Sequence, residues 1–352
     1  MSVTVKDLAA MTGISTSTIS RVLSGRGYVK EETRQIVEAA AKASGYQYKK
    51  ACAMRNSVKM VMMIMGEVSN DIYAQSIRGI ASIFDAHNIM YVGTYGDRYN
   101  AEKLEFYMRH AISNHFEGMI LFTPIETPSF IRMMKSCSIP CIALNRPLET
   151  IEMDEICMDN KAAGRLAVEY LYSKGHTRIA HLTIPGYSSV EYRTRGFISE
   201  VKRLGLEFCD SDIIPAEDTF ESGVTIGSVI AVSKKDITAV YAPNEGLALG
   251  VIEGLRRCGK RVPEDISVIA TDNSVRSIQG NITTVSCNHY EMGVQAALLF
   301  IERSKNLSGA RRQIFLTPEI VERESVRDIR DGVAPVIQSQ HVLSPEGTGL
   351  LP

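Results

Sequence analysis

The feature that most constrains the fold is a series of short apolar segments that alternate with amphipathic stretches and then begins again. The first series includes "MVMMIM", "IMYVGTY", "GMILFT" and "PCIAL", and the second runs from "EICM" through "RIAHLTI" and "AVYA" to "SVIAT". Apolar strands that alternate with helices indicate a parallel sheet covered by helices on both faces. The sequence therefore predicts two similar α/β lobes in residues 60–326, with a ligand cleft between them at the carboxyl ends of the strands.

Residues 4–44 show a different pattern, with helical periodicity in three short pieces. Thr4 and Ser15 stand where side-chain oxygens would cap the first two helices. Ala9 allows these two helices to approach closely, Gly13 supplies the positive φ of a tight turn, and Ile19 fills the space between them. This spacing is typical of a helix-turn-helix.

The second of these helices has an unusual outer face. Its apolar residues turn inward, which leaves hydroxyl groups and one guanidinium outside: Thr16, Ser17, Ser20 and Arg21. Residues 1–55 hold nine Lys and Arg against four acids, although the whole chain has a net charge of −1. The pattern favours a helix that enters the major groove of DNA, and the alternative is a surface helix of a small bundle.

The segment "TVKDLAAMTGISTSTISRVLSG" resembles the head of the lac repressor family. The similarity continues through "PNEGLALGVIEGLRRCGKRVPEDISVIATDN", "TTVSCNHYEMG" and "PEIVERESV". It implies a multidomain protein with a small all-α helix-turn-helix head, a hinge, and a two-lobed α/β core like that of periplasmic binding proteins. The expected limits are head 1–46, hinge 47–59, core 60–326 and a mobile tail 327–352, with lobe 1 at about 60–158 and 289–315 and lobe 2 at about 159–288 and 316–326.

The resemblance also implies which residues contact a double-stranded DNA operator. Base edges would be read by Thr16, Ser17 and Arg21. Phosphates would be touched by Thr4, Ser15, Thr18, Ser20, Ser24, Tyr28 and Thr33. Arg21 is the candidate for a guanine, because a guanidinium can donate two hydrogen bonds to O6 and N7.

The hinge departs from the family pattern, which has a proline and a leucine that wedges into the minor groove. Met54 is the large apolar side chain in "KKACAMRNS" that could serve as a wedge, with Lys49, Lys50 and Arg55 on the phosphates. The alternative is a charged tether that inserts nothing.

For the cleft, the resemblance implies five effector-binding residues: Tyr73, Asn145, Arg193, Asn244 and Asp272. Tyr73 would stack on the apolar face of a sugar. An arginine, an amide and a carboxylate together suit a ligand rich in hydroxyl groups, so we expect a sugar or sugar derivative. An acidic or phosphorylated ligand is the alternative if Arg146 or Arg195 assists Arg193.

Other classes of protein are disfavoured. The longest apolar runs, such as Met60–Met65, are too short for a membrane span, and the N-terminus lacks a secretory signal, so we expect a cytoplasmic protein. The seven cysteines contain no C-x-x-C, and we expect neither a metal nor another cofactor. No hydrolase or nucleotide-binding motif indicates an enzyme. The tail has no leucine heptads and so cannot form the helix that makes tetramers of some family members, and we expect a homodimer. The resemblance implies a ligand-responsive regulator, with repression as the favoured role.

Overall fold

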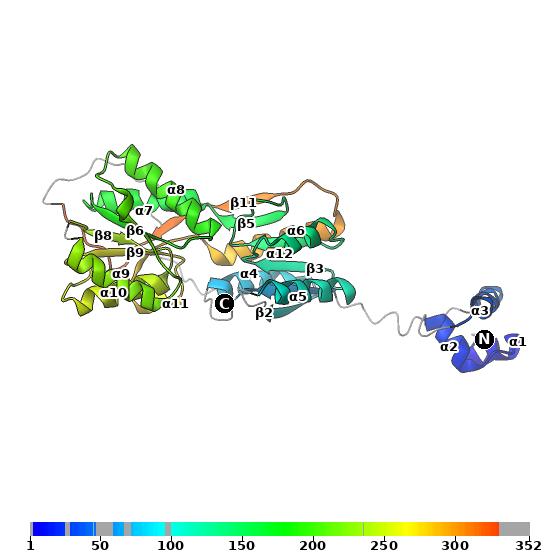
Figure 1. The fold of residues 1–352 in the computed structure, drawn as a ribbon. Helices are drawn as coiled ribbons and strands as arrows, with labels where there is room; N and C mark the ends of the chain where they lie inside the picture. Colours follow the sequence, from blue (N-terminus) through cyan, green and yellow to red (C-terminus); the bar gives the residue numbers. More distant parts are fainter. Residues whose placement is uncertain are drawn as a thin grey trace, which may run out of the picture. The chain divides into compact units, whose positions relative to one another are not determined.

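The computed structural model describes residues 3–24, 29–44, 46, 59–66, 72–95, 100–234 and 236–330 (Figure 1). Contacts within the chain divide it into two units, Met1–Lys59 and Met60–Pro352. No helix among the described residues is long and apolar enough to cross a membrane.

The N-terminal unit consists of three helices around a small apolar core. They are α1 (Val5–Thr12), α2 (Thr16–Ser24) and α3 (Glu31–Ala43). The buried residues at the centre are Leu8, Ile19, Val22 and Val37. Each helix contributes at least one of them, which is the inward packing that the apolar spacing predicts.

The turn between α1 and α2 has the predicted conformation. Gly13 has φ +68°, a value that residues with a Cβ rarely adopt. Thr4 caps α1: its Oγ accepts a hydrogen bond from the Asp7 N–H at 3.3 Å, and the Asp7 carboxylate accepts one from the Thr4 N–H at 2.7 Å. Ser15 Oγ accepts a hydrogen bond from the Thr18 N–H at 3.2 Å at the start of α2.

Lobe 1 of the larger unit is built on a six-stranded sheet in the order β11-β5-β4-β3-β1-β2. The four pairings from β11 to β1 are all parallel. The strands are β1 (Lys59–Met65), β2 (Ile89–Tyr95), β3 (Gly118–Phe122), β4 (Cys141–Leu144), β5 (Asp154–Met158) and β11 (Gln313–Leu316). The helices are α4 (Ile72–Ala86), α5 (Ala101–Ser113), α6 (Pro128–Lys135) and α12 (His289–Lys305).

Strand β1 shows why this sheet is covered on both faces. Val61, Met63 and Met65 pack in one apolar cluster with residues of α4 and α12. Met62 and Ile64 point the other way, into a second cluster with residues of α5 and α6. Successive side chains of a strand alternate between faces, so a continuous apolar run requires helices on both. The predicted α/β fold class is confirmed.

Lobe 2 repeats the arrangement in the order β12-β10-β9-β8-β6-β7, parallel except for β12 against β10. Its strands are β6 (Ile179–Thr183), β7 (Ile213–Pro215), β8 (Ala239–Tyr241), β9 (Ser267–Thr271), β10 (Thr283–Ser286) and β12 (Glu319–Val321). Its helices are α7 (Asn160–Ser173), α8 (Ser188–Arg203), α9 (Phe220–Ser233), α10 (Glu245–Arg257), α11 (Val275–Gln279) and the 3₁₀ turn η1 (Asp210–Asp212). Figure 1 shows α7 and α8 on one face of the sheet and α9 and α10 on the other.

The chain crosses between the lobes three times: from β5 to α7, from β10 to α12 and from β11 to β12. Each crossing leaves from the carboxyl end of a strand. The last one lies after Leu316, one residue beyond the limit expected for lobe 1. The carboxyl ends of the two sheets therefore face the junction between the lobes.

The prediction of a mobile tail from residue 327 was wrong for residues 327–330, because lobe 2 supplies partners for their backbone groups. The Arg327 N–H donates to Ser267 Oγ at 3.0 Å, and the Ile329 N–H donates to the Lys174 carbonyl at 2.8 Å. The remainder, 331–352, lies outside the described residues.

Candidate functional site

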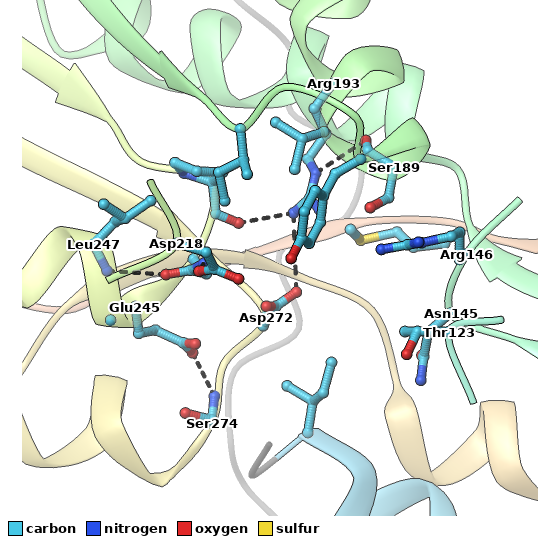
Figure 2. A pocket seen from close by; sticks show the side chains of 18 of the residues that line it. Thr123, Asn145, Arg146, Ser189, Arg193, Asp218, Glu245, Leu247, Asp272 and Ser274 are labelled. Atoms are coloured by element: carbon cyan, nitrogen blue, oxygen red, sulfur yellow. Dashed lines mark hydrogen bonds and ion pairs between the residues drawn. The ribbon is translucent and has the colours of Figure 1, made fainter. Parts of the chain in front are cut away.

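A cavity of about 500 Å³ lies at the junction of the two lobes and is lined by residues of both (Figure 2). Thr123 and Asn145 directly follow β3 and β4 of lobe 1, and Asp272 directly follows β9 of lobe 2. This is the predicted position, at the carboxyl ends of parallel strands. The volume is typical of a cavity that holds a small molecule.

Arg193 is a charged residue of this cavity that is held by several contacts. It stands on α8 and is only 6% exposed. Its Nε donates to the Ser189 carbonyl at 3.2 Å and its Nη1 to the Pro243 carbonyl at 3.0 Å. The same Nη1 lies 3.9 Å from Oδ1 of Asp272. The guanidinium is therefore fixed in direction and faces a carboxylate.

Asp272 follows β9 with φ +109°, a strained value for a residue with a Cβ. Its N–H donates to the Val285 carbonyl at 2.9 Å. Burial raises the pKa of its carboxyl group, while Arg193 acts in the opposite direction. Its carboxylate points toward the cavity, as Figure 2 shows.

Asn244 is the N-cap of α10, and both ends of its amide are engaged. Its Oδ1 accepts a hydrogen bond from the Leu247 N–H at 2.9 Å, and its Nδ2 donates to Oδ1 of Asp218 at 2.6 Å. The two side chains come from different loops of lobe 2 and together form part of the cavity wall.

Glu245 also lines the cavity, and the sequence reasoning missed it. It is 4% exposed, and its Oε1 accepts a hydrogen bond from the Ser274 N–H at 2.6 Å. Burial, together with the nearby Asp272 carboxylate, raises the pKa of Glu245 to about 7. The sequence feature that could have indicated Glu245 is its position directly after the capping Asn244, at the start of a helix that faces the cleft.

Asn145 brings an unpaired donor to the lobe 1 side. Its backbone has φ +69°, and its N–H donates to the Ile156 carbonyl at 3.0 Å. Its Nδ2 is buried and has no hydrogen-bond partner among the described residues. Buried polar atoms are normally paired, so this amide is a candidate to bind an acceptor atom of a ligand.

Tyr73, which we expected to stack on a ligand, does not line the cavity in this structure. Its side chain is 3% exposed, packs against Phe122 with ring centroids 5.0 Å apart, and shares a hydrogen bond with Thr123 Oγ1 at 2.6 Å. Tyr73 belongs to the apolar stripe of α4 with Ile80, so the helix turns it into lobe 1. The neighbouring Ile72 lines the cavity instead.

The two additional arginines considered from the sequence separate in the structure. Arg146 lines the cavity, and its guanidinium lies 4.9 Å from the ring centroid of Tyr187 in the other lobe. Arg195 is exposed and lies over the ring of Tyr192, away from the cavity lining. The ionisable lining comprises Arg146, Arg193, Arg276, Asp218, Glu245 and Asp272, together with His289. Guanidiniums and carboxyl groups are thus equal in number.

In the N-terminal unit, the structure places the expected base-reading residues on one exposed surface of α2: Thr16, Ser17 and Arg21. Thr4, Ser15 and Ser20 are exposed as well, whereas Thr18 and Thr33 are half-buried. The side chain of Ser24, and the whole of Tyr28, Lys49, Lys50, Met54 and Arg55, lie outside the described residues.

The described part of the chain contains no group of three or more His, Cys, Asp or Glu side chains that could hold a metal ion.

Family models match a part of each unit of the chain. The family described as "Bacterial regulatory proteins, lacI family" matches residues 4–48, and a periplasmic binding protein-like domain matches residues 168–326. The HTH-type transcriptional repressor CytR of Escherichia coli (strain K12) is 27% identical over 331 residues, which cover 92% of this chain and 96% of that protein.

Two solved structures share the fold. One is described as a complex of the transcriptional regulator CelR with cellobiose, with a TM-score of 0.70, 24% identity, and coverage of 92% of this chain and 99% of that one. The other is described as the lac repressor dimer bound to operator and an anti-inducer, with a TM-score of 0.69, 22% identity, and coverage of 93% and 100%.

Proposed function

The chain belongs to the lacI family of bacterial regulatory proteins, and from this premise we propose that it is a ligand-responsive transcriptional repressor. It binds a near-palindromic DNA operator as a homodimer. Its effector is a neutral sugar or sugar derivative held in the cavity between the lobes.

The exposed face of α2 supports the DNA-binding part of this proposal. Thr16, Ser17 and Arg21 lie on it, while Ile19 is fully buried on the opposite side. The helix therefore presents short hydroxyls and one guanidinium to the major groove without disturbing the core of the unit. Arg21 reads a guanine, and the hydroxyls contact single acceptors or a thymine methyl group.

The single observation that carries the effector proposal is the set of fixed polar groups at the carboxyl ends of both sheets. Arg193 supplies donors, Asp272 supplies acceptors, and Asn145 offers an unpaired amide N–H from the other lobe. A hydroxyl both donates and accepts, so a polyol can use all three.

The acidic side chains that lie among the arginines of the cavity favour a neutral ligand over a phosphorylated one. A phosphate near Arg193 would also face the acidic groups of Asp218, Glu245 and Asp272. A neutral polyol meets no such repulsion, and its hydroxyls can accept from arginine and donate to carboxylate at the same time.

Regulation follows from a ligand that contacts both lobes. Such a ligand stabilises the arrangement of the lobes in which it contacts both of them. The size of the shift depends on how much more tightly the ligand binds that arrangement than the other arrangements. By linkage, the operator must change the affinity for effector by the same factor as the effector changes the affinity for operator.

The proposal is tested with two assays on the full chain. Operator sequences are selected from random DNA and their affinities measured at several salt concentrations, and sugars and sugar phosphates are screened by thermal shift and calorimetry. We expect a near-palindromic site with salt-dependent affinity, two chains per complex, and a neutral sugar that changes that affinity. Absence of salt-dependent DNA binding would refute the regulatory function, and exclusive binding of phosphorylated sugars would refute the neutral effector.

A further inference from the structure

Two cysteine sulfurs meet in lobe 1, outside the effector cavity. Cys137 lies in the turn after α6, and Cys141 begins β4. Their Sγ atoms are 3.5 Å apart, and they lie 3.5 and 3.4 Å from the same carbonyl oxygen, that of Ile139. The turn thus holds both thiols around one acceptor, and a disulfide bond would require the sulfurs to approach by about 1.5 Å.

The two thiols differ in access. Cys137 is half-buried, whereas Cys141 is 8% exposed. A small oxidant in solution therefore reaches Cys137 first. Cys141 is then the nearest group that can react with an oxidised Cys137.

The pKa values of the two thiols also differ, and the more accessible Cys137 has the lower one. The hydrogen bond from Cys141, aided by the positive charge of Arg311, lowers the pKa of Cys137 to about 7. The same hydrogen bond and burial raise the pKa of Cys141 well above its ordinary value. Near neutral pH a substantial fraction of Cys137 is therefore thiolate while Cys141 stays a thiol, and the thiolate is the nucleophile in reactions with peroxides.

We propose that Cys137 and Cys141 form a peroxide-sensitive dithiol that closes to an intrachain disulfide. The Cys137 thiolate attacks one oxygen of hydrogen peroxide, the O–O bond breaks, and the departing hydroxide takes a proton to become water. Cys137 is now a sulfenic acid. The Cys141 sulfur attacks that sulfur, the S–O bond breaks, and the Cys141 proton leaves with the hydroxyl as a second water. The two thiols lose two electrons and the peroxide gains them.

The position of the pair separates this chemistry from effector binding. Cys141 is paired with Met119 of β3, which in turn is paired with Met62 of β1. The dithiol therefore lies at the amino-terminal end of β4, beside the start of β3 and in register with the middle of β1. Asn145, which lines the cavity, follows the opposite end of β4.

The test uses the reduced full chain exposed to hydrogen peroxide at neutral pH, followed by alkylation of the remaining thiols and mass spectrometry. Cleavage after lysine and glutamate yields the peptide 136–149, whose cysteines are Cys137 and Cys141 alone. We expect this peptide to become lighter by two hydrogen atoms and to resist alkylation until a reductant is added. In the reduced protein, iodoacetamide should modify Cys137 about tenfold faster than an ordinary cysteine at neutral pH.

The matched variants are Cys137→Ser, which removes the reacting thiol, and Cys258→Ser, which removes an exposed thiol elsewhere. The disulfide should disappear in the first and persist in the second. Cys137→Ser keeps the buried Cys141, so loss of folding is not expected, and circular dichroism checks this. Recovery of peptide 136–149 with both thiols alkylated after peroxide, or with an oxidised Cys137 beside a free Cys141, would overturn the proposal.

Discussion

The Asn244 side chain joins the start of α10 to the Asp218 carboxylate: Oδ1 accepts from the Leu247 N–H at 2.9 Å, and Nδ2 donates to Asp218 at 2.6 Å. One residue therefore caps a helix and orients an acidic group of the cavity. Changes at Asn244 should affect stability and ligand affinity together, and the two effects can be separated.

Asn244→Ala should destabilise the protein by about 1 kcal/mol, because the first turn of α10 loses its cap. It should also weaken effector binding, since Asp218 loses the hydrogen bond that it accepts from Asn244. Asn100→Ala is the matched control: Asn100 caps α5 through the Lys103 N–H at 3.0 Å and does not line the cavity. Denaturant unfolding should show a similar loss for both variants, and calorimetry should show weaker binding for Asn244→Ala alone. Equal ligand affinities in the two variants would contradict a role of Asn244 in the site.

Arg193→Ala and Asp272→Ala should each abolish the response to effector while operator binding persists. The two charges lie 3.9 Å apart in the cavity of the larger unit, where both can contact the ligand. Removal of either one leaves hydroxyls of the bound ligand without hydrogen-bond partners. Arg195→Ala is the control, because Arg195 lies two residues further along α8 and is exposed. Calorimetry gives the effector affinity and fluorescence anisotropy the operator affinity. Undiminished effector binding by both cavity variants would place the site elsewhere.

The sequence predicts the fold better than it predicts the cavity, and particular residues show why. The run "MVMMIM" has to be covered on both faces, so β1 and its helices follow from local pattern alone. Tyr73 has the right chemistry for a sugar, but the helical period that aligns it with Ile80 turns it into the core. The helical period is visible in the sequence, and it indicates burial where the positional resemblance indicates a contact with ligand.

Contacts between separate loops were not predictable in the same way. Glu245 owes its raised pKa to burial beside Asp272, which follows a different strand. The contact between Cys137 and Cys141 depends on the turn that bends both thiols toward the Ile139 carbonyl. In both cases the residue types are visible in the sequence, whereas the distances come from tertiary structure.

Arg21→Ala should reduce the preference for one or two operator positions by about 1–3 kcal/mol, because a bidentate contact to a base is lost. Effector binding should be unchanged. Lys42→Ala is the control: it removes the same charge from an exposed position in the last turn of α3. Competition between operator and scrambled DNA measures the preference. If Arg21→Ala keeps the specificity ratio of the wild type, Arg21 touches no base.

The hinge prediction rests on residues outside the described part of the chain. Met54→Ala should weaken operator binding roughly tenfold or more without changing its salt dependence, because the minor-groove wedge is lost. Lys50→Ala should instead reduce the slope of log affinity against log salt by about one, because one phosphate contact is lost. Circular-permutation gel shifts report whether the operator is bent. An unbent operator, with Met54→Ala binding as tightly as wild type, would favour a charged tether.

Glu245 should make the stability of the larger unit depend on pH. Its pKa is raised from the ordinary 4.5 to about 7, chiefly by burial. Below the ordinary pKa the Glu245 carboxyl is neutral in both the folded and the unfolded chain, so its burial adds no electrostatic penalty to folding. Between pH 4.5 and about 7 the Glu245 carboxyl is ionised in the unfolded chain but still protonated in the folded chain, so unfolding releases a proton. The free energy of unfolding therefore falls as pH rises through this range, by a few kcal/mol in all. Above about pH 7 both states are ionised and the loss is complete.

Glu245→Gln should remove this component, because a neutral amide oxygen can still accept the hydrogen bond from the Ser274 N–H. Urea unfolding from about pH 5 to about pH 8 should show the variant gaining stability relative to wild type as pH rises, with the difference constant above about pH 7. Subtracting the two curves cancels the contributions of the buried His181 and His289, whose pKa values are also shifted by burial. The interaction of Glu245 with Asp272 remains part of the difference. Glu221→Gln, at an exposed position in the first turn of α9, is the matched control and should run parallel to wild type. If Glu245→Gln also ran parallel, the Glu245 carboxyl would ionise alike in the folded and unfolded chain, and the cavity would carry an additional negative charge at acidic pH.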